Sequence, residues 1–398
     1  MKERSLNFLK LVDRYVGIPA LYILAAVRGG LSLLLPPRAC SVRTVVMVKL
    51  WGVGNLVMII PLIRAVRGRF PEARIHFVTL EGNAELLQAL PELDGITTLK
   101  TGSIFAALCG VLQLPFRLQR LKPDLFLDFE QFLRITPLLA ILSGATQRVG
   151  LRTPGQARAL LYNIKVPYRI DRHMTRTFGD VVRCAGIDTA RLASLEVPRS
   201  AVAAGRVEKL LEEIADGERI VAIHPGSGDN FPARRWPIEK FAAVAEKVHR
   251  ATGARIVLTG TAPEAGLATR FTRCSPVPFA NLMGELNLLE FVEFLARVDI
   301  LITNDTAPVH IASALNKPIV ALYGPNTPDL YGPMNDLARA FYLRFPCSPC
   351  ITNLNAKTSS CQVPSCILNI ESDRVAETVL RLLDRNRSEH PADKVVPR

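Results

Sequence analysis

The stretch that decides the fold is Asp299-Ile-Leu-Ile-Thr-Asn-Asp-Thr-Ala-Pro-Val-His310, continued by Ile311-Ala-Ser-Ala-Leu-Asn-Lys-Pro-Ile-Val-Ala-Leu-Tyr-Gly324. Its apolar run 300–303 predicts a buried strand ending in a polar turn, and Pro308 is typical of the first turn of a helix. The apolar run 319–323 predicts the next strand. Ligands of open α/β sheets bind beyond the carboxyl ends of the strands, where a helix N-terminus attracts phosphate. The stretch therefore predicts half of a site for a phosphorylated ligand.

The same alternation of short β-branched runs and helical stretches fills most of the chain. It begins at Thr44 and restarts after a polar, alanine-rich passage near residue 200. This rhythm predicts α/β domains in which helices cover both faces of a parallel sheet. We expect two doubly wound domains, at 41–200 and 201–385, facing across a cleft that takes two substrates. The polar residues 386–398 are expected to form a disordered tail. The strands predicted are 45–48, 74–79, 124–128, 148–151, 219–223, 255–258, 300–303 and 319–323, and the helices 56–67, 81–90, 132–142, 174–185, 201–214, 238–250, 263–273 and 288–296.

Composition and charge narrow the class of partner. The 398 residues are 49% hydrophobic and 21% charged, which is typical of a folded globular protein. A net charge of +13 favours anionic partners such as phosphate ligands and acidic lipids. Few aromatic residues and no recognisable binding module argue against nucleic acid as a partner. Scattered single thiols indicate a reducing compartment, and we expect these to be inert: Cys40, Cys109, Cys184 and Cys274.

Residues 1–40 differ from the rest of the chain, because eight Lys or Arg and only two acids lie in the first 50 positions. Their longest uncharged run, 15–27, is shorter than the roughly 20 apolar residues of a membrane-spanning helix. A basic, partly amphipathic segment favours an in-plane anchor on an anionic membrane surface, on the cytoplasmic side of the cell membrane. The alternative is a helix packed on the protein's own surface. The apolar stripe of this segment consists of Leu6, Leu9, Val12 and Val16.

Two further motifs follow predicted strands. In Lys49-Leu-Trp-Gly-Val-Gly-Asn-Leu-Val57, Gly52 and Gly54 indicate a tight turn where the backbone approaches a ligand. As a dinucleotide fingerprint this turn is incomplete, since a third glycine is absent. In His224-Pro-Gly-Ser-Gly-Asp-Asn230 the backbone N–H groups suit a phosphate, and Arg234 and Arg235 follow. The alternative is a solvated basic loop.

These motifs, together with Arg235-Trp-Pro, Leu258-Thr-Gly260 and Asn304-Asp-Thr-Ala-Pro-x-His310, resemble those of glycosyltransferase family 9. This is the heptosyltransferase-like group of lipopolysaccharide assembly, and the resemblance runs from about residue 44 to residue 370. It implies the GT-B architecture of two Rossmann-like domains. It also implies a nucleotide-diphosphate sugar as donor, a cell-envelope glycolipid as acceptor, and inversion at the anomeric carbon without a required metal or other cofactor.

The resemblance implies roles for the loop after the predicted strand 219–223. Gly226, Ser227 and Gly228 would line the donor site. Arg234 would neutralise the diphosphate of the donor.

The turn after the predicted strand 300–303 would complete the donor site. The resemblance implies that Asp305 accepts hydrogen bonds from sugar hydroxyls. The backbone N–H groups of Thr306 and Ala307 would hold the leaving diphosphate. His310 lies about one turn further along, as a ligand contact or as a buried structural histidine.

One residue departs from the family pattern. Family members that resemble this chain have an aspartate at the position of Asn55, thought to be the base that takes the acceptor proton, and a neutral amide cannot take a proton. The candidates to replace it are Asp128 and Glu130, whose alternative role is to cap the predicted helical segment 131–142. With asparagine at this position, two other functions are open: the protein could bind sugar nucleotides or glycans without catalysis, or it could be a GT-B-like sugar-nucleotide epimerase.

A cysteine-rich loop at 347–366 belongs to the second predicted domain. Its spacing, C-x2-C-x10-C-x4-C, suits a structural Zn²⁺ bound by four thiolates. The alternative is a lid or acceptor loop with reduced thiols, and disulfides come last. The four residues are Cys347, Cys350, Cys361 and Cys366.

Overall fold

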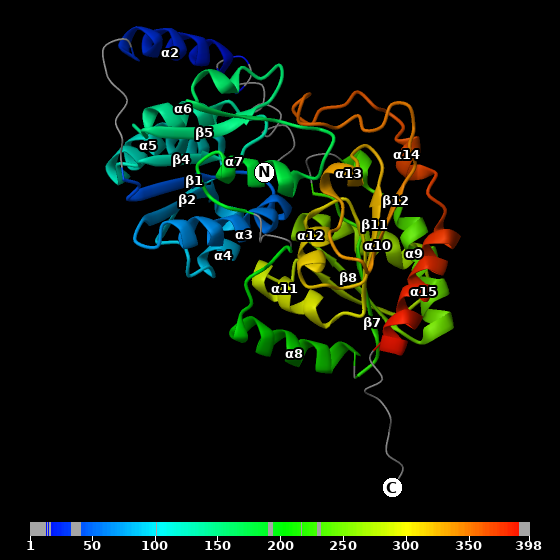
Figure 1. Cartoon of the computed structure of the whole chain (residues 1–398). Coiled ribbons are helices and arrows are strands. Elements are labelled where there is room, and N and C mark those ends of the chain that lie inside the picture. The colour runs from blue at the N-terminus through cyan, green and yellow to red at the C-terminus, as the bar shows by residue number, and fades with distance from the viewer. Residues whose placement is uncertain are drawn as a thin grey trace. The chain divides into compact units, whose positions relative to one another are not determined.

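The computed structural model describes residues 13, 15, 17–32, 41–100, 102–189, 194–215, 217–228 and 232–389. The chain divides into two units (Figure 1). The first unit comprises Met1–Ser194 with Ile351–Ser359, and the second comprises Leu195–Cys350 with Ser360–Arg398. Part of the cysteine-rich loop thus belongs to the first unit, whereas all of it was expected in the second domain.

The first unit is built on a six-stranded sheet in the order β3-β2-β1-β4-β5-β6, and all its strand pairs are parallel. The order reverses between β1 and β4, which is where ligands bind in doubly wound sheets. Helix α3 packs on α7, and helices α5 and α2 both pack on α6. The strands are β1 (Thr44–Val48), β2 (Arg74–Leu80), β3 (Gly95–Leu99), β4 (Leu125–Asp128), β5 (Gln147–Arg152) and β6 (Ile164–Pro167). The helices are α2 (Gly17–Ser32), α3 (Val53–Arg69), η1 (Glu81–Asn83), α4 (Ala84–Gln88), α5 (Ile104–Leu121), α6 (Ile135–Leu142), η2 (Arg158–Leu160) and α7 (Met174–Arg183).

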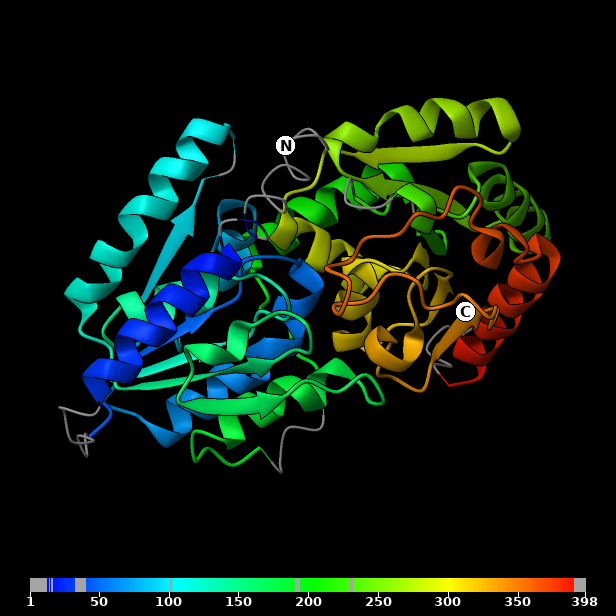
Figure 2. The same cartoon turned by 90° about the horizontal axis from the view of Figure 1, so that it is seen from above.

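The second unit repeats this plan with a sheet in the order β12-β11-β10-β7-β8-β9, again parallel throughout. Its order reverses between β7 and β10. Helices α10 and α15 pack on α9, while α8 and α12 pack on α11 (Figure 2). The strands are β7 (Ile220–His224), β8 (Arg255–Gly260), β9 (Phe279–Met283), β10 (Ile300–Asn304), β11 (Ile319–Tyr323) and β12 (Ala338–Tyr342). The helices are α8 (Ala201–Ala215), η3 (Pro232–Arg234), α9 (Ile238–Thr252), η4 (Ala262–Glu264), α10 (Gly266–Cys274), α11 (Leu288–Arg297), α12 (Ala307–Ala314), α13 (Pro328–Tyr331), α14 (Ser365–Leu368) and α15 (Ser372–Glu389).

The central strands form because their side chains are apolar and often β-branched, and are buried on both faces of the sheet. All five residues of β1 are buried, as are all five of β10. Local signals fix several helix ends: Asn287 and Glu290 form a capping box at the start of α11, and Gly253 ends α9 at a φ of 69°. The prediction of two doubly wound parallel-sheet domains is therefore confirmed.

Several edge elements were not predicted from the sequence. Strands β3, β6, β9 and β12 lie at or next to the sheet edges, where burial is incomplete and the apolar pattern is weak. Helix α5 contains Pro115 and a nearly uniform apolar run that hides its period. Helix α15 continues to Glu389, so the prediction of a disordered tail is wrong for residues 386–389; residues 390–398 lie outside the described part of the chain.

The N-terminal segment is described from its second half onward. Helix α2 packs on α6 and η2, as in the alternative of a helix held on the protein's own surface. The stripe of Leu6, Leu9, Val12 and Val16, and Cys40 also, lie outside the described residues. Among the helices that are described, none combines the length and the apolar character needed to cross a bilayer.

The segment Ile351–Ser359 is fixed to the first unit by side-chain hydrogen bonds. The buried Asn353 donates from Nδ2 to the hydroxyl of Tyr168 at 2.7 Å. Gln156 donates from Nε2 to the carbonyl oxygen of Leu354 at 2.9 Å. Burial raises the pKa of Tyr168 to about 12, so its hydroxyl stays protonated.

Gly150 in the buried strand β5 gives a test of core packing. A Cβ at this position would lie 2.3 Å from the ring of Tyr162, which is itself fully enclosed. We expect Gly150→Ala to lower the free energy of unfolding by about 1–3 kcal/mol, because the ring has no room to move. The matched control Gly205→Ala in α8 meets no atom within 4 Å and should be neutral or stabilising. Urea unfolding of both variants measures the difference, and equal midpoints would contradict the packing described here.

Candidate active site

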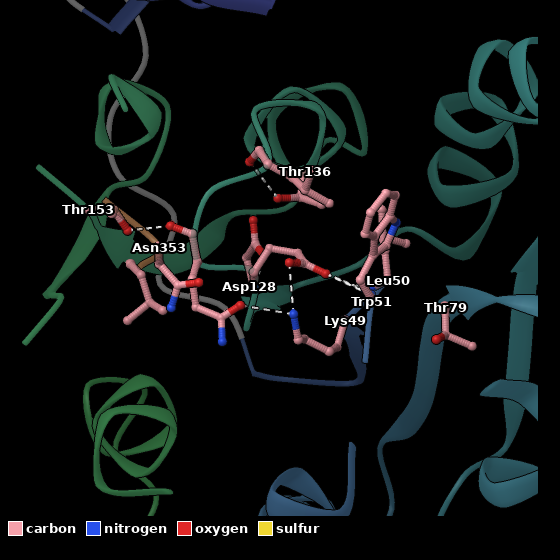
Figure 3. Close-up of polar contacts among 12 residues, drawn as sticks. Lys49, Leu50, Trp51, Thr79, Asp128, Thr136, Thr153 and Asn353 are labelled. Carbon is pink, nitrogen blue, oxygen red and sulfur yellow. Dashed lines mark hydrogen bonds and ion pairs between the residues drawn. The ribbon is translucent and has the colours of Figure 1, made fainter. Parts of the chain in front are cut away.

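The turn between β1 and α3 carries Gly52, and Gly54 lies in the first turn of α3. A buried carboxylate fixes this turn, whose residues Lys49, Leu50 and Trp51 are labelled in Figure 3. Glu130 accepts hydrogen bonds at Oε1 from the backbone N–H groups of Leu50 and Trp51, at 2.7 and 3.1 Å. Its other oxygen lies 2.8 Å from Nζ of Lys49, and both side chains are at most 1% exposed. Burial lowers the pKa of Lys49, while the adjacent Glu130 opposes that shift. The ion pair therefore fixes the backbone of the turn.

Asp128 is enclosed beside this pair. Its Oδ1 accepts from the backbone N–H of Glu130 at 2.8 Å, and its Oδ2 from Nη2 of Arg158 at 2.9 Å. The hydroxyl of Tyr162 donates to the same Oδ2. Burial raises the pKa of Asp128, with Arg158 acting against it. Both members of the Asp128–Arg158 pair are 0% exposed.

These contacts contradict the roles predicted for Asp128 and Glu130. A general base must reach the proton that it takes, and neither carboxylate has a surface that an acceptor hydroxyl can touch. The capping alternative is wrong as well, because the N–H groups of Arg134 and Ile135 at the start of α6 donate to Asp13. The two carboxylates order the loop above them instead.

Asn55 lies at the start of α3, directly after this fixed turn. Its backbone N–H donates to the carbonyl oxygen of Gly52 at 3.0 Å. Gly52 has a φ of +93°, and a Cβ there would lie 3.0 Å from Nδ2 of Asn55. A glycine is therefore required for the turn to present Asn55, which is partly exposed.

In the second unit, Asn304 brings the two predicted turns together. From the end of β10 it donates through Nδ2 to the carbonyl oxygen of Pro225 at 2.8 Å, and its Oδ1 accepts from the backbone N–H of Trp236 at 3.0 Å. The loop after β7 and the turn after β10 are thus neighbours, because β7 and β10 are paired strands.

Asp305 directly follows β10, and Arg234, the last residue of η3, contacts it. Arg234 donates to the carbonyl oxygen of Asp305 at 3.2 Å and to that of Ser227 at 2.8 Å. Its guanidinium lies 3.7 Å from the Asp305 carboxylate, which also accepts from Nδ2 of Asn326 at 2.7 Å. Both charged side chains are thereby held at the carboxyl edge of the sheet.

The loop of Gly226, Ser227 and Gly228 differs from the prediction. The N–H groups of Ser227 and Gly228 both donate to Oε1 of Glu264 at 3.0 Å. Burial alone would raise the pKa of Glu264, but hydrogen bonds from Thr261 and the loop more than offset it, and the pKa is lowered. A charged carboxylate thus occupies the amides that were predicted to bind phosphate. Gly226 is needed for this contact, since a Cβ there would lie 2.3 Å from Oε1 of Glu264.

Helix α12 leaves a different pair of amides for an anion. Thr306 is its N-cap and Ala307 its first residue, followed by Pro308. Among the hydrogen bonds of the described residues, none uses the N–H groups of Thr306 and Ala307. The N-terminus of a helix attracts negative charge, and Arg234 lies beside it. His310 lies buried one turn into α12.

Two residues that shape this site were not predicted from the sequence. Glu264 ends the capping box that begins at Thr261, a pattern visible in Thr261-Ala-Pro-Glu264. Asn326 is the third residue after β11, in the polar turn Gly324-Pro-Asn-Thr327, whereas Asp305 directly follows β10. Both lie beyond the carboxyl end of a strand, where polar residues are candidates for a site.

The four cysteines of the loop 347–366 are free thiols. Burial and the nearby thiols raise the pKa of Cys366 to about 11, so the four lie in one neighbourhood. Within the described residues, however, no group of three His, Cys, Asp or Glu side chains has the geometry to hold a metal ion. The positions of these four cysteines therefore do not fit the structural zinc site that their spacing in the sequence suggested.

Two Rossmann-like units, each with a reversal of strand order and polar turns at the carboxyl ends of its strands, make up the GT-B fold. The solved structures that are similar include a family 9 glycosyltransferase from Veillonella parvula, with a TM-score of 0.68 at 21% identity over 86% of this chain and 97% of that one. The E. coli ADP-heptose lps heptosyltransferase II superposes with a TM-score of 0.67 at 22% identity, over 87% of this chain and 99% of that one.

The particular family follows from the sequence comparison. The model of glycosyltransferase family 9 (heptosyltransferase) matches residues 113–359. Lipopolysaccharide heptosyltransferase 2 of Escherichia coli K12 is 28% identical over 73% of this chain and 85% of its own length. Lipooligosaccharide heptosyltransferase 2 of Haemophilus influenzae is 26% identical over 72% and 84%. The chain belongs to glycosyltransferase family 9.

The Lys49–Glu130 pair predicts a large stability loss when one charge is removed. Lys49→Met leaves Glu130 buried without its cation, and we expect the free energy of unfolding to fall by about 3–5 kcal/mol. Adding Glu130→Gln to Lys49→Met should recover part of the loss, because a neutral amide still accepts from Leu50 and Trp51. Urea unfolding measures both, with the exposed Lys209→Met as control. A single variant no less stable than this control would contradict the role of the pair.

His224 predicts a pH dependence of stability. Burial lowers its pKa from 6.5 to about 4, although Glu264 opposes the shift. The folded protein keeps the ring neutral while the unfolded chain takes up a proton, so stability is lost as the pH falls from 6.5 to about 4. We expect this loss, about 3 kcal/mol at most, to be absent from His224→Asn, whose side-chain amide can still hydrogen bond with the Thr259 hydroxyl. Unfolding midpoints at several pH values test this; parallel pH profiles would refute it.

Proposed function

We propose that this protein is an inverting glycosyltransferase that moves a heptose from a nucleotide-diphosphate donor to a lipopolysaccharide-type glycolipid. Membership of family 9 supports glycosyl transfer. Heptose as the sugar is supported by the names of the relatives, which are heptosyltransferases from several bacteria. A nucleotide diphosphate is supported by the E. coli heptosyltransferase WaaC solved with ADP, which shares the fold.

The observation that carries the proposal is the N-terminus of α12 beside Arg234. In this proposal the amides of Thr306 and Ala307 and the guanidinium of Arg234 bind the diphosphate and stabilise it as it leaves. These positive groups offset the developing charge, so no metal ion or other cofactor is required. Asp305, oriented by Asn326, accepts hydrogen bonds from the hydroxyls of the sugar.

The acceptor lies against the turn at Gly52 and the start of α3 at Gly54 in this proposal. The amide of Asn55 orients the acceptor hydroxyl but takes no proton. The hydroxyl oxygen forms a bond to the anomeric carbon from the face opposite the phosphate, the bond to the phosphate breaks, and the proton passes to water. The rate then depends on orientation and on stabilisation of the diphosphate. The glycolipid acceptor places the protein at the cytoplasmic face of the cell membrane.

Loss of Arg234 tests the donor site. Arg234→Ala removes charge-assisted hydrogen bonds to the diphosphate, and we expect ADP or ADP-heptose to bind roughly tenfold to hundredfold more weakly. Calorimetry measures the dissociation constants. The matched control is Arg270→Ala, which removes an exposed arginine paired with Glu239 on the surface. Equal affinities of wild type and Arg234→Ala would overturn the proposed donor site.

Asn55 and the burial of Asp128 and Glu130 also favour a second candidate function, a non-catalytic protein that binds sugar nucleotides. Release of ADP in the presence of donor and acceptor glycolipid distinguishes the two. We expect turnover by the wild type, and a faster rate for Asn55→Asp because a general base contributes about 10²–10⁴-fold. Donor binding without any turnover by the wild type would establish the non-catalytic function, and product formed from donor alone would indicate an epimerase.

A further inference from the structure

The outer face of helix α5 carries a row of large apolar side chains that nothing in the described structure covers. Phe105 is 78% exposed, Leu108 44%, Leu112 70% and Phe116 68%. Their spacing of three, four and four residues places them on one side of the helix. The opposite side is buried through Ala107, Leu114 and Leu118. We call the row of Phe105, Leu108, Leu112 and Phe116 the α5 stripe.

The position of α5 leaves this stripe on the surface of the first unit. The helix contacts α6 and the edge strand β3, and β3 and α5, both cyan, run side by side in Figure 2. Helix α2 also packs on α6 and exposes two large side chains of its own, Tyr22 at 58% and Ile23 at 64%. Single exposed apolar residues scattered over a surface need no explanation, whereas four large ones in a row on one helix face favour an interaction site.

The charge around the stripe indicates the kind of partner. Between residues 95 and 123 the chain contains four Lys or Arg and no Asp or Glu. Arg117, Arg120 and Lys122 lie at the C-terminal end of α5, and none of these three forms an ion pair with a carboxylate among the described residues. An apolar row beside cationic side chains that lack an acidic partner suits a partner with an apolar interior and an anionic surface layer.

We propose that the α5 stripe docks the protein on an anionic lipid bilayer. The helix lies in the plane of the interface: its Phe and Leu side chains enter the boundary between headgroups and acyl chains, while Arg117, Arg120 and Lys122 pair with lipid phosphates. A second copy of the chain is the weaker occupant, because the same helix offers no carboxylate to neutralise these cations. The purpose of docking rests on the proposed function, since a lipid-linked acceptor is met only at a membrane.

Vesicle binding by the full-length protein tests the proposal. The probe is a vesicle of phosphatidylcholine with roughly one third phosphatidylglycerol, compared with phosphatidylcholine alone. We expect the wild type to sediment with the anionic vesicles. The double variant Leu112→Glu/Phe116→Glu should bind them roughly tenfold more weakly or worse, because two large apolar contacts are lost and two anions are added. The variant Arg117→Gln/Arg120→Gln should also weaken binding and reduce its dependence on salt.

The matched control is Val202→Glu/Val363→Glu, which changes two apolar side chains of the second unit that are 72% and 66% exposed. This control should bind as the wild type does. Wild-type binding by Leu112→Glu/Phe116→Glu, or no binding by the wild type, would overturn the proposal. A lipid-free dimer of the wild type that this variant abolishes would assign the stripe to a second copy instead. The vesicles hold no acceptor, and calorimetry with ADP on the same variants reports the donor site separately, so failure of one proposal is distinguishable from failure of the other.

Discussion

In each unit, one buried carboxylate accepts hydrogen bonds from two successive backbone N–H groups. These hydrogen bonds fix the backbone conformation of the loops after β1 and β7. In the first unit Glu130 holds the N–H groups of Leu50 and Trp51 after β1, and in the second Glu264 holds those of Ser227 and Gly228 after β7. Each carboxylate comes from a neighbouring segment: Glu130 follows β4 and Glu264 follows β8. The two halves of the molecule therefore share a device as well as a topology. An anion placed below a loop fixes its backbone before any ligand arrives, and preorganisation of this kind lowers the entropy lost on binding.

The carboxylates of Glu130 and Glu264 differ in how their negative charge is neutralised, and the two loops therefore differ in local charge. Glu130 meets the ammonium of Lys49, so the first loop stands on a neutral, fully buried pair. Glu264 has only a longer contact of 3.4 Å to the half-buried Arg235. Its carboxylate leaves a negative group beneath the second loop, and the positive character of that region comes from Arg234 and the start of α12. This charge distribution explains why we propose an anion site at the turn after β10 rather than at the glycine-rich loop.

Much of the fold was predictable from the sequence, because central strands such as β1 and β10 are buried on both faces and are therefore visible in the sequence as apolar runs. The turn at Asp305 was predictable for the same reason, since the end of a central strand and a proline in the next helix are local signals. The roles of Asp128 and Glu130 were not. Whether a carboxylate is free or enclosed depends on Arg158 and Lys49, which are distant along the chain and approach it only in the folded state. Helix α5 was not predicted, because its exposed face is as apolar as its buried face and the sequence therefore shows no helical period.

The return of residues 351–359 to the first unit means that neither unit corresponds to one continuous piece of polypeptide. A fragment that stops at Ser194 would lack Asn353 and Leu354, leaving the Tyr168 hydroxyl and the Gln156 amide without these partners. If residues 195–398 were exchanged as one segment with those of a related protein, the nine residues 351–359 would move with them and would have to pack on a first unit of different sequence. Shuffling of sugar specificity by exchange of whole halves is therefore restricted in this chain, and variation within single loops is the easier route for its evolution.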